Sequence, residues 1–152
     1  MKWLLLSLLV AAQGAAAAVL QPGEPLPVIR LQDQNGKPLA IPRETKLVFF
    51  TSEMGGSRLM ARTLDALPRT ALQDKSAVYV ADISGMPAIF TTIVALPRLQ
   101  KLPYPVALVR DEKNAAVLPR KPGTVTVLKF DEGKISAVEF ARDAQQISRH
   151  LK

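Results

Sequence analysis

Two short apolar runs separated by a helical pattern limit most strongly what this chain can fold into. Lys46–Thr51 forms a continuous apolar run that is too short for a helix, which indicates a strand buried on both faces. Ala77–Asp82 is a second run of this kind. Between them, apolar side chains recur at helical spacing over residues 60–71, which predicts an amphipathic helix that Pro68 kinks or ends. We therefore expect a buried sheet with at least one helix packed on it.

The rest of the chain continues this alternation. A small hairpin is expected from Val28–Leu31 to Leu39–Ile41, because the intervening Asn-Gly pair suits a turn. The other predicted elements are strands at Pro105–Val109, Thr124–Phe130 and Ile135–Phe140, a helix that begins at Gly85-Met86-Pro87 and is weakened at Pro97, a charged turn at Arg110–Asn114, a hairpin turn at Asp131–Lys134, and a final helix through Ala144, Ile147 and Leu151. This order predicts the α/β class, with a central mixed β-sheet and helices on both faces.

The first residues have the pattern of a secretory signal. Met1–Ala18 begins with Lys2, continues as an apolar run, and ends in small residues that offer cleavage after Ala16 or Ala18. An uncleaved membrane anchor is the competing interpretation. Division into a signal peptide, residues 1–18, and one domain, residues 19–152, predicts a periplasmic or secreted protein. With no cysteine after the apolar run, a lipid-anchored bacterial lipoprotein is excluded.

The composition excludes several kinds of chemistry. The chain has no cysteine and one histidine, so disulfides, thiolate metal sites and thiol catalysis are impossible. Its net charge is +7, but the basic residues are scattered singly, which argues against a nucleic-acid partner and for at most weak contact with an anionic membrane surface. No Gly-rich nucleotide motif is present, so no cofactor is expected.

Four segments together resemble the thioredoxin-like superfamily, especially its exported TlpA/peroxiredoxin-type branch. The segments are Gln21–Pro27, Leu31–Lys37, Tyr104–Val109 and Thr126–Ile135. The resemblance covers the chain from Leu20 to Lys152. It implies a three-layer sandwich that carries an N-terminal hairpin extension.

The same resemblance assigns a role to the turn after the first apolar run. In active relatives an aromatic residue and a C-x-x-C motif stand there, and the register places Glu53 at the aromatic residue, Met54 at the attacking cysteine and Ser57 at the resolving one. A thioether does not deprotonate and a serine hydroxyl does not ionise near neutral pH, so neither replaces a thiolate. Thr51 matches the peroxiredoxin loop, but no sulfur nucleophile follows it. The chain is therefore expected to be redox-inactive.

A second landmark of the active relatives also differs. They place a cis-proline immediately before the strand that faces the dithiol. Here Gly123 or Thr124 occupies that region, and Pro122 comes slightly too early. Both halves of the redox site have therefore changed.

Other uses of this loop can be weighed from the residues. Ser57 would need a base to act as a nucleophile, and His150 is expected on a solvent-facing helix, so a helix-capping hydroxyl is the favoured interpretation. Backbone N–H groups of residues 55–57 with Arg58 could hold an anion. Three methionines, Met54, Met60 and Met86, raise a copper(I) hypothesis, although Met60 fits the core better.

Binding is the positive role that this loop suggests. The candidate surface consists of Met54, Gly55, Gly56, Ser57 and Arg58, because methionine adapts to its partners and glycine allows close backbone approach. The predicted function is a redox-inactive exported accessory or chaperone-like module that binds an unidentified protein or peptide. The alternatives are a cysteine-independent, cofactor-dependent oxidoreductase and a copper-handling protein.

Overall fold

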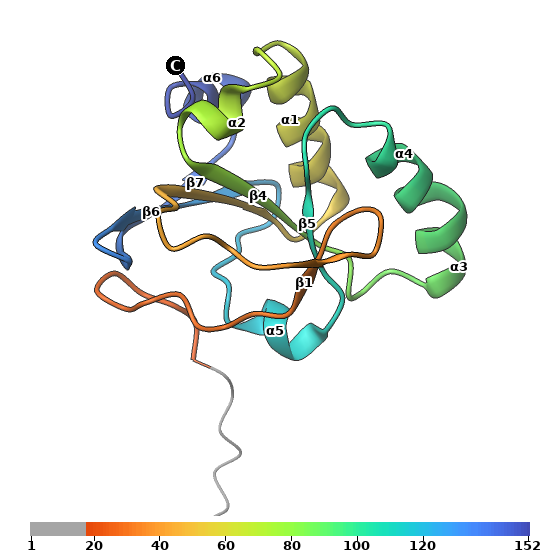
Figure 1. Ribbon diagram of the computed structural model, residues 1–152, viewed down its shortest axis with the longest axis horizontal. Helices are drawn as coiled ribbons and strands as arrows, with labels where there is room; N and C mark the ends of the chain where they lie inside the picture. The colour runs from red at the N-terminus through yellow and green to blue at the C-terminus, as the bar shows by residue number, and fades with distance from the viewer. Residues whose placement is uncertain (1–17) are drawn as a thin grey trace, which may run out of the picture.

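The computed structural model describes residues 18–152, which form a seven-stranded mixed sheet and the helices around it (Figure 1). The predicted signal peptide, apart from Ala18, lies outside the described residues. The strands are β1 Leu31–Gln32, β2 Pro38–Leu39, β3 Leu47–Thr51, β4 Ala77–Asp82, β5 Ala107–Val109, β6 Val125–Asp131 and β7 Lys134–Ala141. The helices are α1 Met54–Asp65, α2 Ala71–Asp74, α3 Ala88–Phe90, the π-helical η1 Thr91–Ala95, α4 Leu96–Gln100, α5 Glu112–Ala116 and α6 Ala144–Ser148.

The strand order is β2-β1-β5-β4-β3-β6-β7. The central strands β3, β4 and β5 run parallel, whereas β6 pairs antiparallel with β3, and β7 antiparallel with β6. At the other edge, β1 pairs antiparallel with both β2 and β5. The mixed sheet and the small N-terminal hairpin predicted from the sequence are confirmed.

Two apolar cores lie on opposite faces of the sheet, because successive side chains of a strand point to opposite sides. Phe49 belongs to the first core, beneath α1, α2, α4 and α6, while Val48 and Phe50 belong to the second. All three are almost completely buried, as expected for a strand covered on both faces. Figure 1 shows α5 and the N-terminal segment below the sheet, opposite the larger helical layer. The predicted three-layer arrangement is confirmed.

The β6–β7 hairpin turn follows directly from its sequence. Glu132 and Gly133 both have positive φ, 49° and 78°, as the two central residues of a type I′ turn require. The turn predicted at Asp131–Lys134 is therefore confirmed.

The charged turn predicted at Arg110–Asn114 is wrong in part, because α5 begins within it. Asp111 adopts an extended conformation and its carboxylate accepts a hydrogen bond of 2.8 Å from the Lys113 N–H. An aspartate in this position satisfies a free donor of the first helical turn. The helix-capping role of Asp111 was missed in the sequence.

The predicted weakening at Pro97 is also wrong, since the helix continues through it to Gln100. A proline lacks an N–H, and its ring collides with the carbonyl four residues earlier. Here the preceding turn is widened into η1, in which the Leu96 N–H bonds to Thr91 O. The wider turn allows the proline to follow without ending the helix.

None of the helices formed by residues 18–152 combines the length and apolarity that spanning a membrane would require.

Candidate functional site

The segment that replaces the redox motif joins β3 to α1. Glu53 is extended and precedes the first helical residue, Met54. Its carboxylate does not cap the helix but accepts a hydrogen bond from the N–H of Gly123, in the loop before β6. The structure therefore brings the two predicted halves of the site, residues 53–58 and residues 123–124, into direct contact.

A close backbone approach also joins the two halves. An ideal Cβ built on Gly56 would lie 2.6 Å from the carbonyl oxygen of Thr124. Only glycine fits such a contact without movement of the backbone. No cis peptide bond occurs in residues 18–152, and Gly123 turns the chain with a φ of 72°. The loop before β6 therefore approaches α1 with all of its peptide bonds in the trans form.

The capping role predicted for Ser57 is wrong. Ser57 lies within α1, and its N–H already bonds to Glu53 O at 3.1 Å. Its hydroxyl instead donates to Thr51 Oγ1 at 3.0 Å, and that oxygen lies 3.1 Å from the Tyr79 hydroxyl. Burial raises the pKa of Tyr79, while its hydroxyl partners act in the opposite direction. These three hydroxyls form a polar link between β3, α1 and β4.

His150 is not solvent-facing, contrary to the prediction. Its ring packs edge-on against Phe49 with 6.5 Å between centroids, and its Nε2 lies 2.9 Å from a Glu139 carboxylate oxygen. Loss of water around the ring lowers the pKa of His150, although Glu139 opposes this effect. The histidine therefore contributes to the core beneath α6 and supplies no base to Ser57.

The anion site considered at the start of α1 has a negative charge of the chain itself beside it. The Glu53 carboxylate oxygen lies 3.7 Å from the position of a Cβ on Gly55, so an external anion would meet a negative charge there. Arg58 is exposed on the same helix. The helix start is accordingly a poor place for an anion.

A hollow of about 620 Å³ opens beside Met54. It lies between the start of α1, the β4–α3 loop and α5. Its lining residues are Ser52, Glu53, Met54, Asp82, Ser84, Gly85, Met86, Pro87, Phe90, Glu112, Ala115, Ala116 and Arg120. Sequence reasoning identified Met54 in this set but did not identify the hollow, because its walls come from distant parts of the chain.

An ion pair forms part of the wall of the hollow. Arg120 lies 3.1 Å from Asp82, whose side chain is only 6% exposed and also accepts a 2.6 Å hydrogen bond from the Ser84 hydroxyl. The Arg120 guanidinium lies over the Phe50 ring, 5.4 Å from its centroid. The partners Asp82 and Arg120 are 38 residues apart, so no local sequence signal could have paired them.

The three methionines do not form one site. Met54 and Met86 both line the hollow, but Met60 is completely buried in the first core. The described part of the chain also has no group of three or more His, Asp or Glu residues that could hold a metal ion.

Several solved structures with a similar fold are those of thiol-disulfide enzymes. A thio-disulfide isomerase from Thermus thermophilus superposes with a TM-score of 0.53 at 20% identity, over 84% of this chain and 91% of that one. The chain has a thioredoxin-like fold. The thioredoxin domain of a thiol-disulfide oxidoreductase from Bacteroides vulgatus gives 0.54 at 16% identity, over 88% and 99%. A thiol:disulfide interchange protein from a Bacteroides species gives 0.54 at 18%, over 87% and 91%.

The expected thioredoxin-like fold is therefore confirmed, and the chain that adopts it contains no cysteine. No family model and no curated protein matches the sequence. Thiol–disulfide exchange requires an attacking thiolate and a second sulfur, and this chain contains neither.

Proposed function

We propose that this thioredoxin-like protein is an exported, redox-inactive binding module that receives an extended polypeptide segment in the hollow beside Met54. The observation that carries the proposal is the hollow itself, which opens next to the loop from which both sulfur positions have been lost. The segment that it fits has an apolar side chain next to a basic one.

The apolar part of the argument is the set of adaptable side chains around the opening. Met54 is 42% exposed, an unusual state for a methionine, and Met86 and Phe90 line the opposite side. The adjoining helix also exposes Ile89 and Ile93, at 72% and 65%. Surfaces that bind varied apolar side chains typically have methionine and aromatic side chains that are partly exposed to solvent.

Charge supports a basic partner. The hollow has three carboxylates, on Glu53, Asp82 and Glu112, but only one cation, on Arg120. This negative excess stands out in a chain whose net charge is +7. A lysine or arginine next to the apolar anchor would compensate for it.

Contact between the two loops limits where such a segment would lie. The Glu53 carboxylate already accepts a hydrogen bond from the Gly123 N–H, and the Thr124 carbonyl oxygen lies close to Gly56. The segment would therefore lie on the Met86 side of Met54 rather than between the loops.

The test uses the mature chain, residues 19–152, and two fluorescent peptides. In one peptide leucine alternates with lysine, and in the other leucine alternates with glutamate. Anisotropy titration is expected to show tighter binding of the lysine peptide, which weakens with added salt. Ala116→Trp fills the hollow and is expected to abolish binding, whereas Ala144→Trp, at an exposed position of α6, is expected to leave it unchanged. Equal peptide binding by these two variants would exclude the hollow as the binding site.

Charge reversal provides a second matched pair. Glu112→Lys is expected to weaken binding of the lysine peptide about tenfold, as loss of one favourable close charge interaction would. Asp65→Lys makes the same change in net charge at the exposed end of α1 and is expected to leave binding unchanged. If the mature chain binds neither peptide, the proposed function is wrong.

Export rests on the sequence of residues 1–18 and has a direct test. The full chain, expressed in a Gram-negative host, is expected to be cleaved after Ala16 or Ala18 and so to begin at Ala17 or Val19. Intact-protein mass spectrometry of the periplasmic fraction measures this. A full-length mass in the cytosolic fraction would contradict the proposal.

A further inference from the structure

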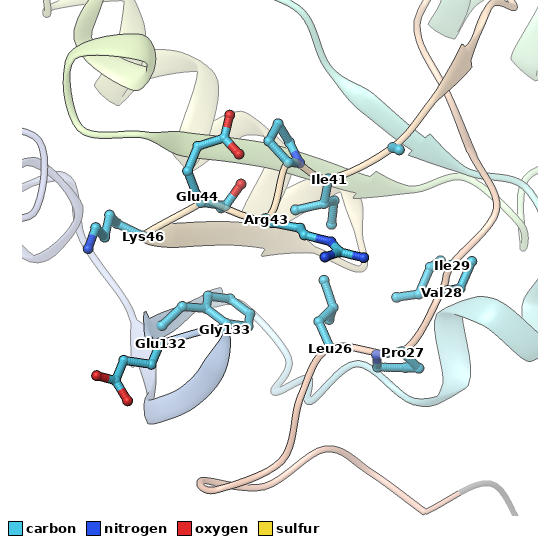
Figure 2. A pocket seen from close by; sticks show the side chains of 14 residues that line it. Leu26, Pro27, Val28, Ile29, Ile41, Arg43, Glu44, Lys46, Glu132 and Gly133 are labelled. Carbon is cyan, nitrogen blue, oxygen red and sulfur yellow. The ribbon is translucent and has the colours of Figure 1, made fainter.

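A second hollow of about 710 Å³ lies between the N-terminal segment and the segment that leads into β3 (Figure 2). It shares no residue with the hollow beside Met54. Its lining residues are Leu26, Pro27, Val28, Ile29, Ala40, Ile41, Pro42, Arg43, Glu44, Thr45, Lys46, Phe130, Glu132 and Gly133. Two segments that cross the second core, residues 26–29 and 40–46, form its sides, and the β6–β7 turn closes one end.

Backbone hydrogen bonds anchor one end of each side. The Gly23 N–H bonds to Ile135 O at 2.7 Å and the Ile135 N–H bonds to Glu24 O at 2.9 Å, which ties the N-terminal segment to β7. On the other side, the Lys46 N–H bonds to Ser76 O at 2.8 Å. Prolines in both segments fix the intervening backbone further. The hollow is therefore largely preformed, as ligand sites usually are.

Part of the wall of this hollow consists of apolar side chains. Leu26, Ile29, Ile41 and Phe130 pack against the second core but remain only partly buried. Val28 at the rim is 98% exposed. A hydrocarbon group placed here would cover apolar surface that the fold itself leaves open to water, which is favourable in proportion to the area removed.

One cation points into this apolar space. Figure 2 shows the Arg43 guanidinium extending between Ile41 and Leu26, while the carboxylates of Glu44 and Glu132 point away from the opening. Arg43 forms no ion pair or side-chain hydrogen bond with any residue in the range 18–152. A guanidinium binds a carboxylate through two parallel hydrogen bonds, so a carboxylate is the group that Arg43 fits best.

We propose that this second hollow binds an amphipathic carboxylate, with the hydrocarbon tail against Leu26, Ile29 and Ile41 and the carboxylate on Arg43. The volume lies within the range of about 300–1,000 Å³ typical of small-molecule sites. This inference does not depend on the proposed function, because the two hollows have different walls and different charge.

The test is calorimetric titration of the mature chain with decanoate and with decylammonium, which share a tail and differ in the sign of the head group. Decanoate is expected to bind once per chain and about tenfold more tightly than decylammonium. Chemical shifts of the methyl groups of Leu26, Ile29 and Ile41 are expected to move together during the titration. Equal affinity for the two probes, or shifts confined to other methyl groups, would overturn the proposal.

Two variants that each remove one positive charge distinguish a specific contact with Arg43 from a general effect of net charge. Arg43→Gln is expected to weaken decanoate binding about tenfold, and Arg62→Gln, which removes the same charge from an exposed position of α1 outside the hollow, less than twofold. Ile41→Trp or Ala40→Trp, which fill the hollow, are expected to prevent binding without loss of the folded far-UV spectrum. If Arg62→Gln weakens binding as much as Arg43→Gln, no specific site exists.

Discussion

The carbonyl oxygen of Thr124 lies so close to Gly56 that a Cβ at this glycine would stand only 2.6 Å from it. This contact joins the start of α1 to the loop before β6, the two segments that form the redox site in active members of the superfamily. In this chain, which has no cysteine, these two segments are tightly packed against each other through their backbones. They form a folded part of the protein and not an open loop.

The close approach predicts opposite effects for two adjacent glycines. Gly56→Ala is expected to lower the free energy of unfolding by about 1–3 kcal/mol, because the methyl group would push apart two backbone segments. Gly55→Ala is expected to be neutral or to stabilise by up to about 1 kcal/mol, since its Cβ would meet only the flexible Glu53 side chain and alanine favours the helix. Urea unfolding measures both, and equal effects would contradict the contact.

The hydroxyl link predicts a graded response. Thr51→Val is expected to cost about 1–3 kcal/mol, because it leaves the buried Tyr79 hydroxyl without its partner. Ser57→Ala is expected to cost about 0.5–1.5 kcal/mol at most, since Thr51 keeps its contact with Tyr79. Thermal or urea unfolding of the two variants checks the order. A larger cost for Ser57→Ala would show that the link is arranged differently.

His150 predicts a loss of stability in mild acid. Its pKa is lowered below the ordinary 6.5, mainly by burial, so the unfolded chain binds this proton more readily and stability falls as the pH drops through 6.5. The pKa of Glu139 is held below its usual 4.5, chiefly by the Lys129 hydrogen bond, so its contribution is present above 4.5 and is lost in stronger acid. His150 and Glu139 therefore both lower the stability of the folded chain as the pH falls.

The measurement is urea unfolding at about pH 7.5 and about pH 5.5, above and below the ordinary histidine pKa. The wild-type chain is expected to be less stable at the lower pH, and His150→Gln is expected to reduce this difference, because the chain has one histidine. An unchanged difference in the variant would show that another group is responsible.

Restoring two sulfur atoms tests the register of the degenerate motif. The double variant Met54→Cys/Ser57→Cys is expected to form an internal disulfide on oxidation and to reduce insulin, whereas the wild-type chain does neither. The thiol introduced at position 54 is expected to keep a pKa of about 8.5 or above, because the negative charge of Glu53 opposes the effect of the helix start. Thiol titration against pH and intact mass measure these properties. The single variant Met54→Cys is the control, and a double variant that forms only intermolecular disulfides would show that the register is wrong.

Much of the sheet could be predicted because its strands carry their own signals. The buried runs that became β3 and β4 are apolar at every central position, and the β6–β7 turn places glycine at a positive φ. The short helix α5 was harder, since only the Asp111 cap marks it. The continuation of the helix through Pro97 could not be predicted, because it depends on the π-turn formed by the five residues of η1.

The candidate site could be located from the sequence but not described. The sequence drew attention to Met54, Ser57 and Thr124, yet the contacts formed around them join residues that are remote in the chain. The Asp82–Arg120 ion pair and the Glu53–Gly123 hydrogen bond join residues 38 and 70 positions apart. Such contacts depend on how the strands are ordered, which no local pattern encodes.

The amino-acid sequence by itself determined that this protein has no thiol chemistry, since a reaction that needs sulfur nucleophiles cannot occur without cysteine. It also determined the alternation of strands and helices, because hydrophobic periodicity is a local property. Only the tertiary structure decided which groups meet. It packs His150 against Phe49, forms the acidic hollow beside Met54, and directs the Arg43 side chain into the second hollow. The physical reason is that a cavity and its charge arise from the spacing of packed elements, which exists only once the chain has folded.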